Sequence, residues 1–161
     1  MTLLYDRDIR LRSVDLKEDV NSFLLWYNTP EVIFYSEGPK VMPYGREVIE
    51  RMINVLSEIG ECYLIEVFKE HTWTPIGDAS ITTKKTPITI GVKEYWGNGF
   101  GTRVLALLIN RAREIGLKKL VVSGIYEYNE RSLRLYSKAG FTETDRFEED
   151  SYNCIKMELK L

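Results

Sequence analysis

The chain has 161 residues, of which 44% are hydrophobic and 29% charged, the size and balance of one globular domain. Its 22 basic and 24 acidic side chains give a net charge of −2, so charge offers no case for nucleic acid as the main partner. No apolar run of about 18 residues is present and the N-terminus carries charges, so we expect a cytoplasmic protein with no membrane-spanning helix. Two distant cysteines and a single histidine, His71, leave no cysteine- or histidine-based metal site.

The first part of the chain predicts a strand and a helix. Residues 9–12 alternate between apolar and charged side chains, which predicts a strand. Asp15 is placed to cap a helix that continues to Tyr27, because apolar residues recur there at helical spacing. Pro30 predicts a break, and the following residues up to Gly45 are rich in proline and glycine, so we expect mostly loop.

The remaining elements follow clear patterns. A second helix is predicted from Glu47 to about Ile59, stopped by Gly60, with one apolar face made of Val48, Met52, Val55 (or Leu56) and Ile59. Later strands are predicted over residues 62–68, 76–81, 88–92, 120–125, 142–147 and 154–159. Later helices are predicted over residues 102–115 and 130–138. This order predicts an α/β fold with a mixed central sheet, and no linker divides residues 1–161.

A glycine-rich turn, residues 97–101, separates a strand ending at Val92 from the helix that begins near Thr102. The N-terminus of a helix carries unpaired amides and a partial positive charge, and glycines let the backbone approach an anion. Arg103 could add a cation. The lysine of a P-loop is absent, and Thr102 stands where a dinucleotide-binding motif needs glycine. The turn is therefore a candidate phosphate site, with a tight structural turn as the alternative.

Two segments resemble a known family. Trp96-Gly97-Asn98-Gly99-Phe100-Gly101 resembles the Q/R-x-x-G-x-G/A motif of GCN5-related N-acetyltransferases (GNAT), although Trp96 replaces the usual Gln or Arg. Residues 129–141 resemble that family's N-x-x-S-x-x-x-Y-x-x-x-G-F segment. The start of the chain, with residues 10–12 and 26–32, is similar to the branch of ribosomal-protein N-terminal and aminoglycoside 6′ acetyltransferases.

The resemblance implies a single-domain GNAT fold, with about four helices around the sheet, that binds acetyl-CoA and needs no metal. It implies transfer of an acetyl group to a primary amine of a small molecule or protein, by direct attack on the thioester. In this family the pyrophosphate lies on the amides of the glycine turn, and the pantetheine arm runs beside the preceding strand. The residues expected at the coenzyme are Ile90, Gly91, Val92, Trp96, Gly97, Asn98, Gly99, Phe100, Gly101, Thr102, Arg103, Asn129, Ser132, Tyr136 and Lys138.

The catalytic groups follow from the resemblance only in part. Tyr136 would be the general acid that protonates the leaving thiolate, since a phenol with a pKa of about 10 is protonated at neutral pH. Thr89, however, stands where many members carry the glutamate that deprotonates the amine. Asp78 and Glu37 are the two candidate bases, and a solvated or hydrogen-bonded acid is the alternative for each.

The acceptor side and the functional class stay open. Tyrosines beside a carboxylate suit a cation, so the candidate acceptor-binding residues are Tyr27, Tyr35, Glu37 and Tyr44. The first hypothesis is an N-acetyltransferase acting on a small-molecule or protein amine. The second, which Thr89 keeps open, is a non-catalytic (acyl-)CoA-binding sensor or assembly module. A homodimer is left open as well.

Overall fold

The structure is a computed structural model, which describes residues 2–39 and 44–161. The strands form a five-stranded sheet in the order β1-β2-β3-β4-β5 and a three-stranded sheet in the order β6-β8-β7. The strands are β1 (Leu3–Asp6), β2 (Ile9–Ser13), β3 (Gly60–Lys69), β4 (Thr72–Thr82), β5 (Ile88–Ile90), β6 (Lys119–Tyr126), β7 (Thr142–Glu149) and β8 (Tyr152–Lys160). The helices are α1 (Leu16–Trp26), α2 (Pro30–Ser36), α3 (Arg46–Ile59), α4 (Phe100–Glu114) and α5 (Glu130–Lys138), with a short 3-10 helix η1 (Lys93–Tyr95) before the glycine turn.

The first sheet buries both of its faces, because successive side chains of a strand point to opposite sides. On β3, Tyr63 and Ile65 face a core shared with α4, whereas Leu64 faces a second core with Phe23 and Trp26 of α1. Helices α1 and α3 pack on β3 and β4, and α4 packs on β1, β2, β4 and β5. Strands β4 and β5 therefore lie between two layers of helices.

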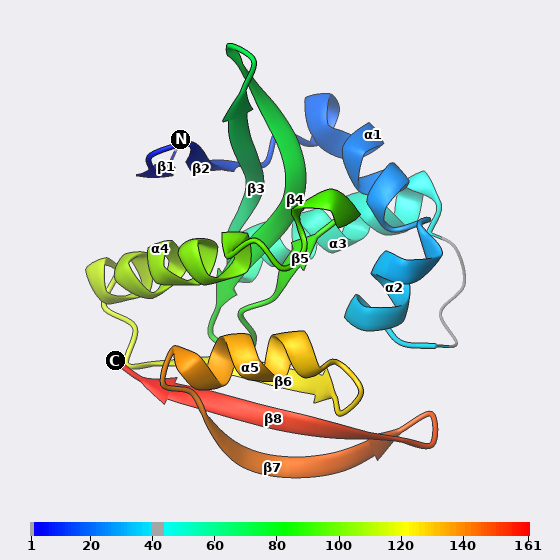
Figure 1. Cartoon of the computed structure of the whole chain (residues 1–161), viewed down its shortest axis with the longest axis vertical. Helices are drawn as coiled ribbons and strands as arrows, with labels where there is room; N and C mark the ends of the chain where they lie inside the picture. Colours follow the sequence, from blue (N-terminus) through cyan, green and yellow to red (C-terminus); the bar gives the residue numbers. More distant parts are fainter. Residues whose placement is uncertain (1, 40–43) are drawn as a thin grey trace.

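The second sheet carries α5 along it, at the end of the molecule away from the β3–β4 turn (Figure 1). Buried Tyr136 and Phe141 join the same core as α4 and the first sheet. Strands β5 and β6 belong to different sheets, so β5 has no partner strand on its outer side in the part of the chain described. The two sheets therefore diverge at the strand that leads into the glycine turn.

The α/β fold expected from the sequence is confirmed, with five α-helices instead of about four. Neighbouring strands within each described sheet run antiparallel, so the expected mixed central sheet is corrected to two antiparallel sheets that separate between β5 and β6. The described helices include none long and apolar enough to cross a membrane.

Three local predictions were wrong. The expected loop after Thr29 contains α2, since Pro30 occupies the first helical position, where proline is tolerated because its missing N–H has no partner there. Strand β1 was not predicted, since Leu3, Leu4 and Tyr5 are all apolar and the sequence shows no alternation there. On α3, Leu56 is buried as the alternative to Val55 predicted, but Val48, Val55 and Ile59 are exposed, and Ile49 and Ile53 complete the buried face.

Candidate functional site

The glycine turn presents a row of unpaired backbone donors at the start of α4. Gly97 and Gly99 have φ values of 74° and 81°, and the space where a Cβ would lie is open at both. The Asn98 side chain closes the turn by donating from Nδ2 to the carbonyls of Glu94 and Trp96, both at 3.1 Å. None of the amides from Gly97 to Thr102 has an acceptor among the described residues. The turn is thus a ready anion site.

The open edge of β5 leads away from this turn. Gly91 N donates to Ile76 O at 2.7 Å, and Ser80 N donates to Pro87 O at 3.1 Å. Pro87 and Gly91 therefore have their backbone groups directed toward β4. Because antiparallel pairing alternates, the backbone groups of Ile88 and Ile90 face the unpaired side. That side can pair with an extended ligand, as the sequence predicted for Ile90 and Val92. Val92 lies beyond the end of β5 and its carbonyl accepts from Tyr95 N at 3.1 Å, so Ile88 and the N–H of Ile90 are the open groups of this edge.

Two predicted coenzyme residues mark the ends of this edge. The Trp96 indole donates from Nε1 to Ile90 O at 2.7 Å, next to the glycine turn. The Tyr136 hydroxyl donates to Thr86 O at 2.8 Å, before β5 begins. Burial raises the pKa of Tyr136, so it stays protonated at neutral pH. Tyr136 is therefore a proton donor at the far end of the edge from the turn.

The start of α5 holds Asn129 and Ser132 where the sequence expected them, on one side of the helix. The Asn129 side chain caps α5 by accepting from Ser132 N at 3.3 Å, and its Nδ2 donates to Tyr35 O at 3.3 Å. Tyr128 donates to Phe34 O, so α2 lies against the loop between β6 and α5. In this arrangement Asn129 bonds to α2, and its contact with the coenzyme stays a prediction.

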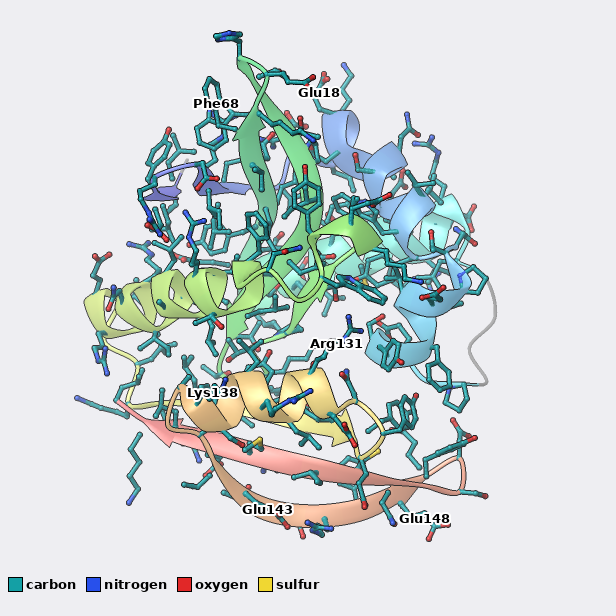
Figure 2. The ribbon with its side chains drawn as sticks, in the orientation of Figure 1. Glu18, Phe68, Arg131, Lys138, Glu143 and Glu148 are labelled. Atoms are coloured by element: carbon teal, nitrogen blue, oxygen red, sulfur yellow. The ribbon has the colours of Figure 1, made fainter. Side chains whose placement is uncertain are left out.

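The structure turns Arg103 away from the glycine turn, whereas the role of Lys138 stays a prediction. The Arg103 guanidinium contacts Asp6 Oδ2 at 2.7 Å and Asp8 Oδ1 at 2.6 Å, and these bonds turn it toward β1 and β2. Lys138 lies on the last turn of α5 (Figure 2), and its side chain is exposed. Arg103 is therefore engaged elsewhere.

The two candidate bases lie in one cluster on the α1 side of the sheet. Asp78 is opposite Thr89 in the register of β4 and β5, so it is the cross-strand neighbour of the position where many family members carry glutamate. Tyr27, the residue after α1, donates its hydroxyl to Asp78 Oδ2 at 3.0 Å and lies 3.5 Å from Thr89 Oγ1. Asp78 is 2% exposed. The chain therefore has a carboxylate one strand away from the usual position.

Burial tunes both carboxylates of this cluster. It raises the pKa of Asp78 to about 7, with the hydroxyl of Tyr27 opposing the rise and the charge of Glu37 adding to it. Burial likewise raises the pKa of Glu37, against the hydroxyl of Tyr44 and the charge of Lys85. The Tyr44 ring stacks on the Tyr27 ring at 5.4 Å. Tyr27, Glu37 and Tyr44 therefore gather around Asp78 as an acidic and aromatic group.

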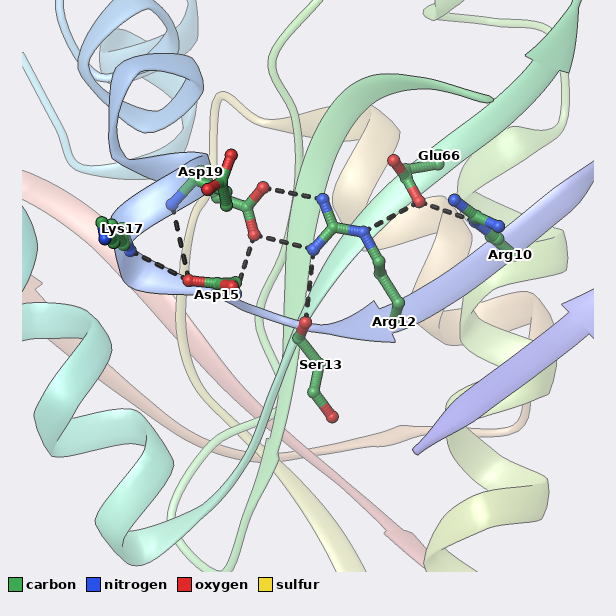
Figure 3. A network of polar contacts seen from close by, with 8 residues as sticks. Arg10, Arg12, Ser13, Asp15, Lys17, Asp19 and Glu66 are labelled. Atoms are coloured by element: carbon green, nitrogen blue, oxygen red, sulfur yellow. Dashed lines mark hydrogen bonds and ion pairs between the residues drawn. The ribbon is translucent and has the colours of Figure 1, made fainter. Parts of the chain in front are cut away.

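Two contacts add to the core packing that holds helix α1 in place. Arg12 pairs with Asp19 of α1 at 2.7 Å and with Glu66 of β3 at 3.1 Å (Figure 3). Gly91 lies against the Trp26 indole, and a Cβ at this position would lie 2.1 Å from Trp26 Cγ. Gly91 is thus needed for close packing of α1 on the end of β5, which holds Tyr27 beside Asp78.

Tyr35 lies apart from the acceptor cluster, and beside it is a residue that the sequence analysis did not select. The Tyr35 ring meets Trp96 edge-on at 5.9 Å. The Arg131 guanidinium lies 3.9 Å from the Trp96 ring centroid and 4.8 Å from that of Tyr35. A basic residue two positions after Asn129 was the only signal in the sequence.

These features fit the coenzyme that the resemblance implies. The turn offers free amides for a diphosphate, and the outer edge of β5 offers backbone groups for an amide-containing arm. Tyr136 stands at the end of that edge, where a thioester would follow the arm. The Asp78 cluster lies on the face of β4 and β5 that carries Thr89.

Comparisons with known proteins identify the family of the chain. A family model described as acetyltransferase (GNAT) domain matches residues 8–142. The uncharacterized N-acetyltransferase YycN of Bacillus subtilis (strain 168) is 37% identical over 51 residues, and the match spans 32% of each chain. The matched segment is therefore about a third of that relative.

Solved structures with low sequence identity share the fold. A domain from Methanocaldococcus jannaschii DSM 2661 has a TM-score of 0.84 at 22% identity, covering 97% of this chain and 100% of that one. A spermidine N-acetyltransferase from Vibrio cholerae in complex with CoA and spermine has a TM-score of 0.75 at 19% identity, covering 96% of both. A ribosomal-protein-S5-alanine acetyltransferase from Vibrio fischeri has a TM-score of 0.79 at 14% identity, covering 99% and 97%.

These structural relatives come from several branches, so they do not assign the chain to the ribosomal-protein and aminoglycoside branch. The family model, in contrast, covers most of the chain and includes the glycine turn, Asp78 and Tyr136. The protein therefore belongs to the GNAT acetyltransferase family.

Proposed function

We propose that residues 1–161 form a single N-acetyltransferase domain that transfers an acetyl group from acetyl-CoA to a primary amine of a small molecule or a protein. The observation that carries this proposal is the row of unpaired amides from Gly97 to Thr102, next to the open edge of β5 that ends at Tyr136. Such a row binds a diphosphate, and such an edge binds an extended arm.

Acetyl-CoA supplies the acetyl group as a thioester, and the protein supplies alignment and proton transfer. The backbone of Ile88 and the N–H of Ile90 orient the arm, since Ile90 O accepts from the Trp96 indole, and the end of the arm comes to Tyr136. Tyr136 gives up its bond to Thr86 O and donates its proton to the departing sulfur. The raised pKa of Tyr136 keeps this proton available throughout the neutral range.

Asp78 takes the proton from the attacking amine, directly or through one water molecule. A carboxyl with a pKa of about 7 is partly ionised at neutral pH and is a stronger base than an ordinary aspartate. Thr89 does not titrate in this range and leaves this task to its cross-strand neighbour.

The acceptor side favours a cationic amine. Asp78 is buried without an ion-pair partner in the described part of the chain, and Glu37 adds a second acidic group beside it. The stacked rings of Tyr27 and Tyr44 add faces that attract cations. A protonated amine would therefore be drawn to this cluster and lose its proton there.

Replacing Tyr136 by Phe tests whether the protein is an enzyme in which Tyr136 acts as the general acid. We expect kcat to fall roughly ten- to a hundredfold, because the proton donor to the leaving thiolate is lost. The affinity for CoA should change by less than about threefold, since the coenzyme is held by backbone groups. Free thiol released from acetyl-CoA measures kcat, with polyamines, aminoglycosides, amino acids and N-terminal peptides as acceptors, and calorimetry measures the affinity.

Tyr5→Phe is the matched control, because Tyr5 is 53% exposed and its ring contacts Trp73, outside the site. An unchanged kcat in Tyr136→Phe would remove Tyr136 from the mechanism. Coenzyme binding without thiol release for any amine would instead favour the sensor or assembly module.

A further inference from the structure

We propose that Arg131 binds the diphosphate of the coenzyme, an inference that rests on the proposed function and adds a side chain to its binding site. The glycine turn alone supplies only neutral amide donors, and a diphosphate carries at least two negative charges. A cation beside the turn is therefore expected.

The two positions where the sequence would place this cation do not supply it. Trp96 occupies the first motif position, where Gln or Arg is usual in the family. Arg103 is held by Asp6 and Asp8 through bonds of 2.7 and 2.6 Å. Breaking both pairs to turn Arg103 toward the glycines would leave Asp8 without its cation and Asp6 with the exposed Arg7 alone, at 3.3 Å.

Arg131, in contrast, is held by the rings of Tyr35 and of Trp96, the residue before the turn, and not by a carboxylate. Its guanidinium lies 3.9 Å from the Trp96 ring centroid, and Trp96 directly precedes Gly97. Its side chain is exposed and forms no salt bridge with the described residues; it extends from the first turn of α5 toward the space between α5 and α2 (Figure 2). The group is thus charged, accessible and unpaired.

The packing of α5 on α4 gives Arg131 the required position. A Cβ at Gly101 would lie 3.4 Å from Leu135 Cδ2, so the first turn of α4 faces Leu135. Arg131 lies one helical turn before Leu135 on the same side of α5. The side of α5 that packs on the glycine turn therefore presents Arg131 to it.

Arginine suits this task because its planar guanidinium donates to two phosphate oxygens at once while one face stays stacked on a ring. The stack with Trp96 and Tyr35 orders the side chain before the ligand arrives, which reduces the entropy lost on binding. Trp96 is itself uncharged, but its ring positions the guanidinium of Arg131.

Calorimetric titration with CoA and with dephospho-CoA tests this inference, because dephospho-CoA lacks the 3′-phosphate and keeps the diphosphate. We expect Arg131→Ala to lower the affinity for both ligands by about tenfold. Arg131→Lys keeps the charge without the planar guanidinium, and we expect it to lower both affinities by about threefold. Arg113→Ala is the matched control: it removes the same charge from an exposed position in the last turn of α4, and both affinities should stay unchanged.

Three results would overturn the inference in distinguishable ways. If Arg131→Ala bound both ligands as the wild type does, Arg131 would have no part in binding. If the variant lost affinity for CoA alone, Arg131 would contact the 3′-phosphate and not the diphosphate. If the wild type bound neither ligand, the proposed function would fail, and this inference with it.

Discussion

Asp78→Asn is expected to lower kcat/KM by about a hundredfold without unfolding the protein, because it removes the base and keeps the shape of the side chain. The amide oxygen of Asn can still accept the hydroxyl of Tyr27, which lies 3.0 Å from the carboxylate. Thiol release at saturating acetyl-CoA measures the loss. Glu37→Gln is the matched control, since it removes the other carboxylate of the cluster; a smaller loss, mainly in KM, is expected there.

The pH dependence identifies the group responsible. The ratio of wild-type to Asp78→Asn kcat/KM cancels the titration of the acceptor amine itself. It should rise with pH up to about 7, where Asp78 ionises, and stay constant above. A ratio that does not change between pH 5 and 9, or a loss no larger than that of Glu37→Gln, would contradict the role of Asp78 as the base.

The ionisation of Asp78 should raise the activity but lower the stability of the fold. The pKa of Asp78 is raised in the folded state, so between its ordinary value and about 7 the folded protein holds a proton that the unfolded chain releases. The contribution of Asp78 to the free energy of unfolding therefore declines as pH rises through this window. Asp78→Asn should remove this contribution and be at least as stable as the wild type at pH 8.

Arg12→Met is expected to lower the free energy of unfolding by about 3 kcal/mol, because it leaves the buried carboxylate of Asp19 without its cation. The Asp19 and Glu66 side chains are each 5% exposed, and Arg12 joins them across β2, β3 and α1 (Figure 3). Glu66 keeps Arg10 at 2.7 Å, so most of the cost falls on Asp19. Denaturant unfolding measures the change, and the melting temperature should fall by roughly 6–12 °C.

Two further variants separate charge from packing. Arg7→Met removes an arginine that is 77% exposed and pairs with Asp6, so a loss below about 1 kcal/mol is expected. Adding Asp19→Asn to Arg12→Met should recover much of the stability, since Asn accepts from Asp15 N as Asp19 does and needs no cation. Equal losses for Arg12→Met and Arg7→Met would refute the account of this network.

The sequence predicted elements best where their signals are local. The bounds of α5 were predicted correctly, because Asn129 caps its first turn and Ala139-Gly140 follows its last. Helix α2 was missed because Pro30 was interpreted as a break, and proline is tolerated both at a break and at the first position of a helix. The buried face of α3 was misassigned because apolar residues lie on two of its sides, and only packing on β3 selects one.

The residues of the candidate site likewise differ in whether a local sequence signal identifies them. The glycine turn and Tyr136 lie in contiguous motifs and could be selected from the sequence. Asp78 and Glu37 could be named only as alternatives, because their proximity depends on the register of β4 and β5 and on α2. Arg131 was not selected, since its contact with Trp96 arises where the two sheets diverge and no sequence spacing encodes it.

The central claim is that the unpaired amides from Gly97 to Thr102 hold the coenzyme. An amide NMR titration of the full chain with CoA measures this residue by residue. The account predicts that the signals of this segment shift more than those of the β7–β8 hairpin and reach saturation together. Saturation of the protein with CoA while these signals stay in place would contradict it.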